Sequence, residues 1–272
     1  MASSRSTWAT FASNAVGSLD GVGALAGSIA GLSGWRRPAT AFAAGSLTVL
    51  AMAPFFLWPV LFLTLPVLVW LIDGSAAQGG RAPSFRQRPA VRAASAGWWF
   101  GFGYFLFGLF WIGEAFLVEA DKFAWLLPFA VTLMPAGLAI FTALAAAAAR
   151  LVWPAGAARI IVLALALSAA EWLRGHVLTG FPWNVLGYAL TWPLSMMQSA
   201  ALFGIYGLTL LAVLIFASPL VLVADAVARG ARNGALWWAA GLVLLAALAV
   251  AILLVVWRRR RKEPAAPPPP PP

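Results

Sequence analysis

Residues 38–72 read PATAFAAGSLTVLAMAPFFLWPVLFLTLPVLVWLI, a run of 35 residues without a formally charged side chain. A membrane-spanning helix needs about 20 consecutive apolar residues, so this run is too long for a single span. Pro54 and Pro59 stand near its middle, where each would interrupt a helix. We therefore expect two membrane helices joined by a tight turn, and the aromatic residues of that turn suit the interface of a bilayer.

The same apolar bias extends along the whole chain. Of the 272 residues, 62% are hydrophobic and only 10% are charged, against about 45–50% and about 25% in ordinary soluble domains. This composition excludes a soluble globular fold. The net charge of +10 comes from basic residues in the gaps between apolar blocks, where they set orientation, so we expect no binding of nucleic acid. Cysteine is absent, which excludes disulfides, thiolate metal sites and a thioester mechanism carried out by this chain alone.

Further apolar blocks predict five more spans, and the expected fold is an all-α, polytopic transmembrane helical bundle of about seven spans over residues 35–257. We expect residues 1–34, rich in Ser, Gly and Ala, to form a weakly structured leader. Residues 258–272 are expected to form a basic, polyproline tail of low complexity. The five additional spans are predicted at residues 93–113, 123–149, 160–174, 199–224 and 234–257.

The distribution of basic residues predicts how this bundle is oriented. The seven-span arrangement places eleven Lys and Arg residues on the side of the leader, and only Lys122 and Arg174 on the other side before the tail. Loops rich in Lys and Arg stay in the cytoplasm, so we expect a cytoplasmic N-terminus. The five cations of residues 258–262 contradict this arrangement, because seven spans would place them outside.

Residues 160–174 form the only predicted span with charges inside it, Glu171 and Arg174. At a spacing of three residues these side chains share one helix face, and they are costly to bury unless they are paired. We expect either a structural ion pair that fixes the helix in the bundle, or a pair that borders a polar cavity open to the outer side. Residues 175–198 are too broken by Gly and Pro for a simple helix and too apolar for a solvated loop, so we expect them at the membrane interface.

This region resembles a known protein family. Residues 171–175 read EWLRG, residues 178–184 read LTGFPWN and residues 186–188 read LGY. Together they closely resemble the EWLRG…LTGFPW…LGY signature of the bacterial apolipoprotein N-acyltransferases. Supporting matches are APF at residues 53–55, WP at residues 58–59 and GFGYFLFGLFWI at residues 101–112. The resemblance covers about residues 38–257.

The resemblance implies a multi-pass enzyme of the bacterial cytoplasmic (inner) membrane. Such an enzyme transfers an acyl chain from a membrane phospholipid, the donor, to the N-terminal diacylglyceryl-cysteine of a diacylated apolipoprotein, the acceptor, and so completes lipoprotein maturation. In that family the chemistry resides in a nitrilase-like domain that follows the seventh span and uses a Glu base, a Lys and a Cys nucleophile. Here 15 residues follow Trp257 and no cysteine is present. We therefore expect this chain to represent the membrane half, with no catalytic residue, cofactor or metal site of its own, and to be inactive alone.

The broken segment also supplies candidates for a site that lines a lipid or substrate. A proline-fixed aromatic segment can end a lateral route for acyl chains at headgroup depth, and the planar fork of Arg174 suits a phosphate. The alternative is that Phe181, Pro182 and Trp183 form an ordinary interfacial anchor. His176 is alone, and we expect it to be a hydrogen-bonded interface residue rather than a base. The candidate residues are Glu171, Arg174, Phe181, Pro182, Trp183, Asn184, Gly187 and Tyr188.

Three alternatives stay open at this point. A small helical transporter would also place ionisable residues inside the membrane, but it predicts a second broken helix in a corresponding half, and the chain has no convincing internal repeat. A non-catalytic lipid-binding membrane protein differs from the enzyme only in lacking the catalytic domain. The tail itself indicates a fragment made by a frameshift or sequencing error after residue 257, against the alternative of a natural, extended polyproline linker.

Overall fold

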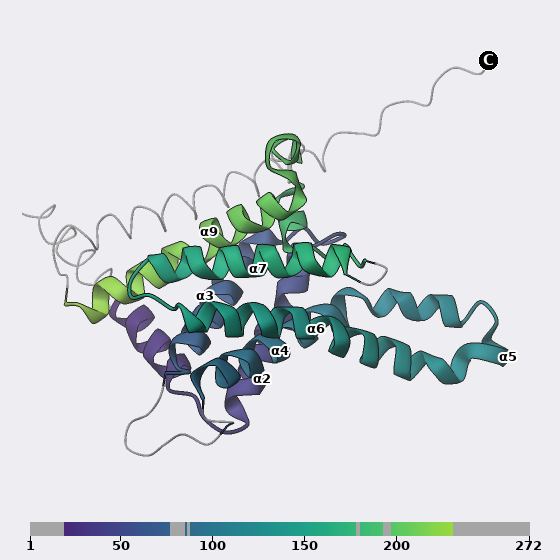
Figure 1. Cartoon of the computed structure of the whole chain (residues 1–272), viewed down its shortest axis with the longest axis horizontal. Coiled ribbons are helices and arrows are strands. Elements are labelled where there is room, and N and C mark those ends of the chain that lie inside the picture. Colours follow the sequence, from purple (N-terminus) through teal and green to yellow (C-terminus); the bar gives the residue numbers. More distant parts are fainter. Residues whose placement is uncertain (1–18, 77–84, 86–87, 178–179, 193–196, 231–272) are drawn as a thin grey trace, which may run out of the picture.

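The computed structural model describes residues 19–76, 85, 88–177, 180–192 and 197–230, and within them all regular structure is helical (Figure 1). The all-helical fold class expected from the sequence is confirmed for this part of the chain. The α-helices are α2 (Arg36–Thr48), α3 (Leu61–Asp73), α4 (Pro89–Gly108), α5 (Ala120–Phe123), α6 (Leu127–Leu151), α7 (Ala158–His176) and α9 (Ala200–Ala228). Short 3₁₀ helices are η1 (Val49–Ala51), η2 (Trp58–Val60), η4 (Phe110–Phe116), η5 (Ala124–Leu126) and η6 (Leu186–Leu190).

The uncharged run of residues 38–72 forms two helices, as expected. α2 and α3 have 13 residues each and are joined by a turn that holds η1, η2 and the two prolines, Pro54 and Pro59. A 13-residue helix is about 20 Å long. Each is therefore shorter than the hydrocarbon core of a bilayer, about 30 Å thick.

The number of long apolar helices is smaller than the number of expected spans. Residues 120–151 and α9 are long and apolar enough to cross a membrane by length and composition. A third candidate is α4 together with η4, which follow one another with a bend of 50°. The described residues thus hold two or three candidate spans, while the expected seventh span, 234–257, and the tail, 258–272, lie outside the described residues.

Part of the expected leader is a helix, contrary to the expectation of weak structure. Residues Leu19–Ala30 are helical, and Ile29 is buried in the core. A Cβ atom added at Gly74 would lie 1.9 Å from the carbonyl oxygen of Ala30, so the end of this helix touches the backbone just after α3. Small residues such as Ala30 and Gly74 permit this close approach. In the sequence, the same kind of residues gave no indication of a membrane span.

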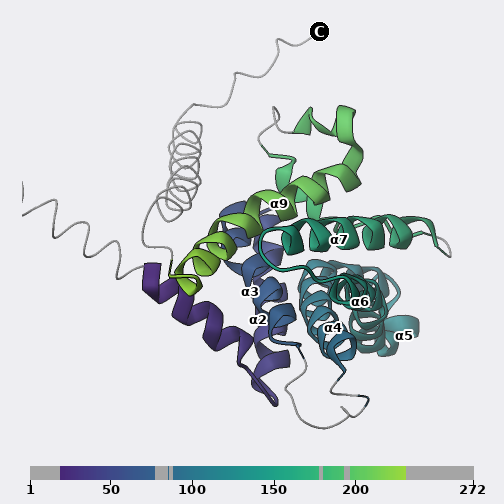
Figure 2. The ribbon, with the colours of Figure 1, turned by 60° about the vertical axis from the view of Figure 1, so that its left-hand side comes forward.

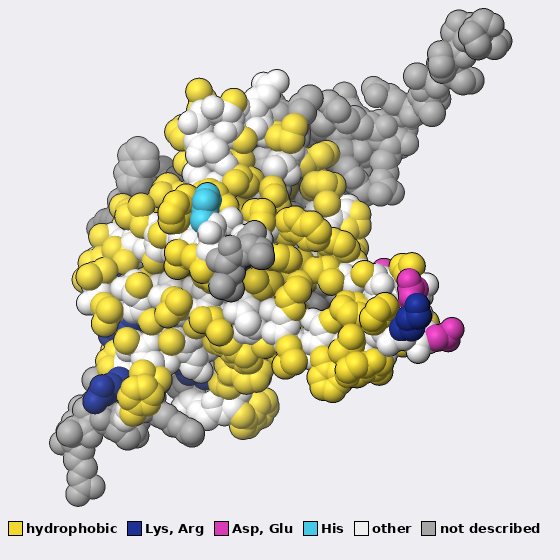
Figure 3. All heavy atoms as spheres, turned by 45° about the vertical axis from the view of Figure 1, so that its right-hand side comes forward, with side chains coloured by type: hydrophobic (Ala, Val, Ile, Leu, Met, Phe, Trp, Pro, Cys, Tyr) yellow, Lys and Arg dark blue, Asp and Glu magenta, His cyan; other side chains and the backbone are white. Residues whose placement is uncertain are grey.

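The helices pack side by side around one core. α4 lies between α2 and α6, α7 lies between α6 and α9, and α9 also packs on α3 (Figure 2). α5, in the turn between η4 and α6, lies furthest out from this body (Figure 1). Large apolar side chains such as Leu133, Leu144 and Leu165 are exposed on the outer faces of α6 and α7, and hydrophobic atoms cover most of the face in Figure 3.

Three arginines meet around the C-terminal end of α3, a region that we call the arginine end. Buried Arg37 donates a hydrogen bond to the carbonyl oxygen of Leu71. The Nε of Arg150 donates to Ser75 Oγ at 3.0 Å, and the Nε of Arg159 lies 3.1 Å from Asp73 Oδ1. α7 begins at this end, so Glu171 and Arg174, in its last two turns, lie towards the opposite end of the bundle.

Candidate functional site

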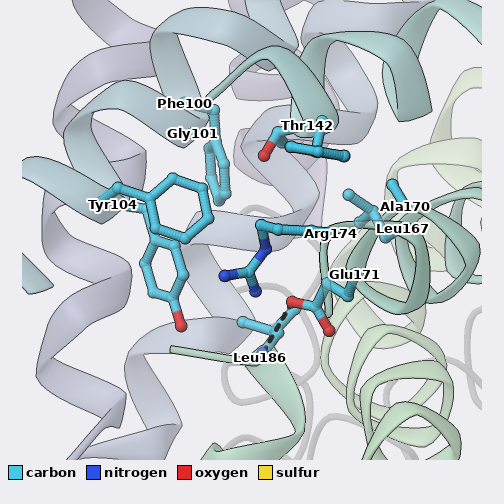
Figure 4. A pocket seen from close by; sticks show the side chains of 11 residues that line it. Phe100, Gly101, Tyr104, Thr142, Leu167, Ala170, Glu171, Arg174 and Leu186 are labelled. Carbon is cyan, nitrogen blue, oxygen red and sulfur yellow. Dashed lines mark hydrogen bonds between the residues drawn. The ribbon is translucent and has the colours of Figure 1, made fainter. Parts of the chain in front are cut away.

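A small cavity lies between α4, α6 and the last turns of α7, and it contains the two charges that the sequence singled out (Figure 4). Its volume of about 30 Å³ is enough for one water molecule. The side chains around it are mainly apolar. The residues that line it are Phe100, Gly101, Tyr104, Phe105, Phe141, Thr142, Leu167, Ala170, Glu171, Arg174 and Leu186.

Arg174 holds the backbone of the segment that follows α7. Its side chain is 2% exposed, and its Nη1 donates to the carbonyl oxygens of Phe181 at 2.9 Å and Trp183 at 2.6 Å. The guanidinium lies over the ring of Phe105, 4.9 Å from the centroid. A buried cation is stable only when such donors and π-faces replace its water. Arg174 therefore fixes residues 181–183 against the bundle.

Glu171 holds the next part of the same segment. Its Oε1 accepts a hydrogen bond from the backbone N–H of Leu186 at 2.8 Å, drawn as a dashed line in Figure 4. Its Oε2 accepts from the hydroxyl of Thr209 on α9, and that hydroxyl accepts from the N–H of Gly187 at 2.9 Å. Thr209 is fully buried. One carboxylate thus ties α7, η6 and α9 together.

The expected ion pair between Glu171 and Arg174 is not formed. No ion pair of the described residues joins them within 4.0 Å, although both line the same cavity. The reason is that each charge has other partners: the segment after α7 offers carbonyl oxygens to the cation, and the carboxylate accepts from the N–H of Leu186 and the hydroxyl of Thr209. The two residues act on one segment rather than on each other.

The backbone of the held segment takes conformations that need particular residues. Gly180 has a φ of 74°, and Asn184 has a φ of 49°. Glycine and asparagine adopt this left-handed region most readily. The carbonyl oxygen of Asn184 accepts from the hydroxyl of Tyr104 at 3.1 Å. Residues 178 and 179 of the motif lie outside the described residues.

Two of the aromatic candidates of the segment, Trp183 and Tyr188, are exposed, whereas Phe181 is half-buried. Trp183 is 47% exposed and stacks on Trp111 of η4, with ring centroids 5.1 Å apart. Phe181 contacts the Trp183 ring at 5.5 Å and packs against the core, and Pro182 is exposed. Tyr188 is 38% exposed. None of these four candidate side chains lines the cavity.

Gly187 has a packing role. A Cβ atom at this position would lie 2.5 Å from the carbonyl oxygen of Ile205. Only glycine lets the segment approach α9 this closely, which brings the Gly187 N–H within reach of Thr209. Of the eight candidates, the structure places Glu171 and Arg174 in the cavity and the other six on the segment that these two hold.

His176 is the last residue of α7, and it makes a hydrogen-bond contact within that helix. Its Nδ1 is 2.7 Å from the carbonyl oxygen of Trp172, and its ring stacks on the Trp172 ring at 4.5 Å. No carboxylate among the described residues contacts it. The described residues also contain no group of three His, Asp or Glu residues that could hold a metal ion.

Sequence analysis missed two residues of this site, Thr209 and Tyr104. Thr209 is one of few polar residues in the apolar run of residues 199–224, and a polar residue inside a predicted span is a signal for a buried partner. Tyr104 is one of only three tyrosines in the chain. Their partners are 38 and 80 positions away in the sequence, and no local pattern reports such contacts.

Sequence comparisons agree with the motif. Residues 44–218 match the sequence model of the family described as apolipoprotein N-acyltransferase N-terminal domain. The apolipoprotein N-acyltransferase of Rhodopseudomonas palustris is 60% identical over 190 residues, which are 70% of this chain and 34% of that protein. That of Bradyrhizobium diazoefficiens is 56% identical over 190 residues, with the same shares, and that of Brucella suis is 51% identical over 205 residues, 75% of this chain and 38% of that protein. The chain spans about a third of the length of these curated relatives.

Proposed function

This chain belongs to the apolipoprotein N-acyltransferase family through the N-terminal domain of that family, and we propose that it is the membrane module of such an enzyme. The complete enzyme transfers an acyl chain from a membrane phospholipid to the N-terminal diacylglyceryl-cysteine of an apolipoprotein, in lipoprotein maturation. The module's part is to hold lipid substrates at the depth where their reactive groups meet the catalytic domain.

This proposal depends on one observation: Glu171 and Arg174 fix the segment of residues 180–190 through hydrogen bonds to its backbone. The first part of this segment, residues 180–185, is irregular, yet the carbonyl oxygens of Phe181 and Trp183 are bound by buried Arg174, and the N–H group of Leu186 is bound by Glu171. Irregular backbone is tolerated at membrane depth only where it is satisfied by protein in this way. The hydrogen bonds therefore support a fixed platform at the edge of the bilayer, irregular at residues 180–185 and continued by η6.

Exposed aromatic side chains on this platform and on the neighbouring η4 and α7 support its position at the headgroup level. Trp183, Trp111 and Trp172 are each about half exposed, and Tyr188 lies on the same segment. Tryptophan and tyrosine favour the interface because their rings are apolar and their N–H or O–H groups are wet. The ester of a phospholipid and the amine of a diacylated lipopeptide lie at this depth as well.

The proposed module is a multi-pass protein of the bacterial inner membrane with about seven spans and a cytoplasmic N-terminus. Two or three of these spans have support from helix length and composition. The shorter helices α2, α3 and α7 complete the count together with residues 234–257. The gathering of Arg37, Arg150 and Arg159 at one end supports a cytoplasmic location for that end.

These 272 residues alone are proposed to have no acyltransferase activity, because without a thiol they cannot form a thioester intermediate. The test is transfer of labelled acyl groups from a phospholipid to the amine of a diacylated lipopeptide by the purified chain. Transfer that depends on the chain would contradict this part of the proposal.

A chimera tests the function of the module itself. Residues 44–218 replace the matching part of the Rhodopseudomonas palustris enzyme, and acyl transfer to the lipopeptide is measured in membranes. We expect the chimera to transfer acyl groups, because the grafted residues supply the same platform. A chimera that accumulates with native helicity but transfers nothing would refute the proposed role.

A further inference from the structure

A second hollow lies at the arginine end. It is an open cleft of about 470 Å³ between the loop that joins α6 to α7 and the adjoining ends of α3 and α9. This volume lies within the range of small-molecule sites, about 300–1,000 Å³. The proposed acyl transfer makes no use of this cleft. The charged residues that line it are Asp73, Arg150, Arg159, Asp225 and Arg229.

The two acids of the cleft are already bound. Arg159 is 6% exposed, and its Nη1 and Nη2 each lie 2.7 Å from an oxygen of Asp225. Its Nε lies 3.1 Å from Asp73 Oδ1, which also accepts from the indole N–H of Trp153 at 2.7 Å. Bidentate and shared contacts of this kind fix all three side chains. The two aspartates therefore form part of the wall of the cleft, with their charges already paired to Arg159.

The other two arginines are free of acidic partners. Arg150 uses its Nε to bind Ser75 Oγ at 3.0 Å, and neither Arg150 nor Arg229 enters an ion pair with another described residue. Three arginines against two aspartates give the lining a formal charge of +1 (3 − 2). α7 begins beside the cleft at Ala158 with no acid in its first turn, so the dipole of this helix adds to the attraction for an anion.

The surroundings of the cleft indicate where such an anion comes from. Leu151 and Val152, the residues directly after Arg150, are 76% and 66% exposed. Leu151 and Val152 do not line the cleft themselves, but they lie in the chain between Arg150 and Trp153, which do. Exposed apolar side chains next in sequence to a guanidinium group without an acidic partner match a ligand that has acyl chains attached to an anionic group. A free phosphate ion would make no use of the apolar pair.

We propose that this cleft binds the phosphodiester group of a phospholipid, with Arg150 and Arg229 as phosphate ligands and Leu151 and Val152 against its acyl chains. The planar fork of arginine suits a phosphate. The site is separate from the acyl-transfer platform, because Arg159 and Arg174 are 15 positions apart in α7, which corresponds to about 22 Å along the helix. A failure of this lipid-binding proposal can therefore be distinguished from a failure of the acyl-transfer proposal.

The experiment measures bound lipid on the full purified chain. The delipidated protein in detergent is titrated with dioleoylphosphatidylglycerol, and the lipids that stay bound are counted by native mass spectrometry. The test variant is Arg150→Gln with Arg229→Gln. The matched control, Arg36→Gln with Arg88→Gln, removes the same charge from two exposed arginines that do not line the cleft. Circular dichroism and melting temperature verify that both variants are folded.

We expect the cleft variant to bind one phosphatidylglycerol about tenfold or more weakly than the control, because charge-assisted hydrogen bonds are lost. Dioleoylglycerol, which has the same chains without phosphate, should bind both variants equally. Three results would overturn the proposal. These are equal lipid binding by the folded cleft variant and the control, equal weakening in both, and displacement of the lipid by an excess of inorganic phosphate, which would make the cleft a site for the free ion.

Discussion

At the scale of single residues, the central feature is Arg174, the largest of the fully buried side chains in the described chain. Its guanidinium binds carbonyl oxygens seven and nine residues further along the sequence. A salt bridge would need only a charge, whereas two backbone acceptors at fixed positions need the planar fork of arginine. The residue therefore stabilises a particular backbone shape.

Replacing Arg174 by Gln should lower the free energy of unfolding by about 2–4 kcal/mol, because two carbonyl oxygens lose their buried, charged donor. The measurement is unfolding of the chain in mild detergent by added sodium dodecyl sulfate, followed by circular dichroism. The control is Lys122→Gln, which breaks an exposed ion pair with Glu119 and should cost less than about 1 kcal/mol. Equal effects of the two substitutions would contradict the role of Arg174.

Glu171 and Thr209 should be energetically coupled. The Thr209 hydroxyl donates to Glu171 and accepts from Gly187, so a double-mutant cycle with Glu171→Gln and Thr209→Val should give a coupling of about 1 kcal/mol. Thr132→Val is the matched control, because the Thr132 hydroxyl bonds only to carbonyl oxygens of its own helix. Additive effects of the first pair would show that the carboxylate does not act through Thr209.

The sequence singled out Glu171 and Arg174, which line one cavity, but did not show how they are connected. A spacing of three residues places Glu171 and Arg174 on one helix face. It does not reveal that the following segment folds back and offers its backbone to both. The ion-pair expectation failed for that reason, and Thr209 was missed because its contact depends on the packing of α9 against α7.

At the scale of helices, small residues set the distances between neighbours. A Cβ atom at Gly45 of α2 would lie 1.9 Å from the carbonyl oxygen of Phe100 in α4. At Gly137 of α6 it would meet nothing within 4 Å. The two glycines therefore have opposite roles although both lie inside helices.

Gly45→Ala should destabilise the chain by about 1–3 kcal/mol or more, since α2 and α4 must separate. Gly137→Ala should instead stabilise it by up to about 1 kcal/mol through helix propensity. The same detergent unfolding measurement compares them. Stabilisation by Gly45→Ala would show that α2 and α4 do not pack as closely as described.

Helix positions were predictable where the apolar blocks are long, and breaks were predictable only where proline marks them. The turn at Pro54 and Pro59 was expected and is present. The bend between α4 and η4 and the non-helical Gly204 inside α9 were not expected. A single glycine among aromatic and aliphatic residues is too common to predict a break.

At the scale of the whole molecule, the two ends differ in charge. Arginines gather around the C-terminal end of α3, while the turn around α5 carries Glu119, Asp121 and Lys122 (Figure 3). This difference agrees with the orientation that the basic residues predict. The complete seven-span topology stays a prediction, because residues 234–257 lie outside the described part of the chain.

The absence of native cysteine makes the orientation directly measurable. Val118, in the turn before α5, is 83% exposed, and Ala155 is exposed in the loop between α6 and α7. In spheroplasts, a membrane-impermeant maleimide should label Val118→Cys at once and Ala155→Cys only after lysis. Labelling of both residues in intact spheroplasts, or the reverse order, would contradict the proposed topology.

The claim that the segment held by Arg174 is the lipid platform of an acyltransferase is tested most directly in the Rhodopseudomonas palustris chimera. The measurement is the rate of acyl transfer to a diacylated lipopeptide by chimeras that carry Arg174→Gln or Lys122→Gln, at equal protein and equal helicity. We predict that Arg174→Gln lowers the rate about tenfold or more, because misplaced substrate groups react slowly, and that Lys122→Gln leaves it unchanged. A folded Arg174→Gln chimera that transfers acyl groups at the unmodified rate would contradict the claim.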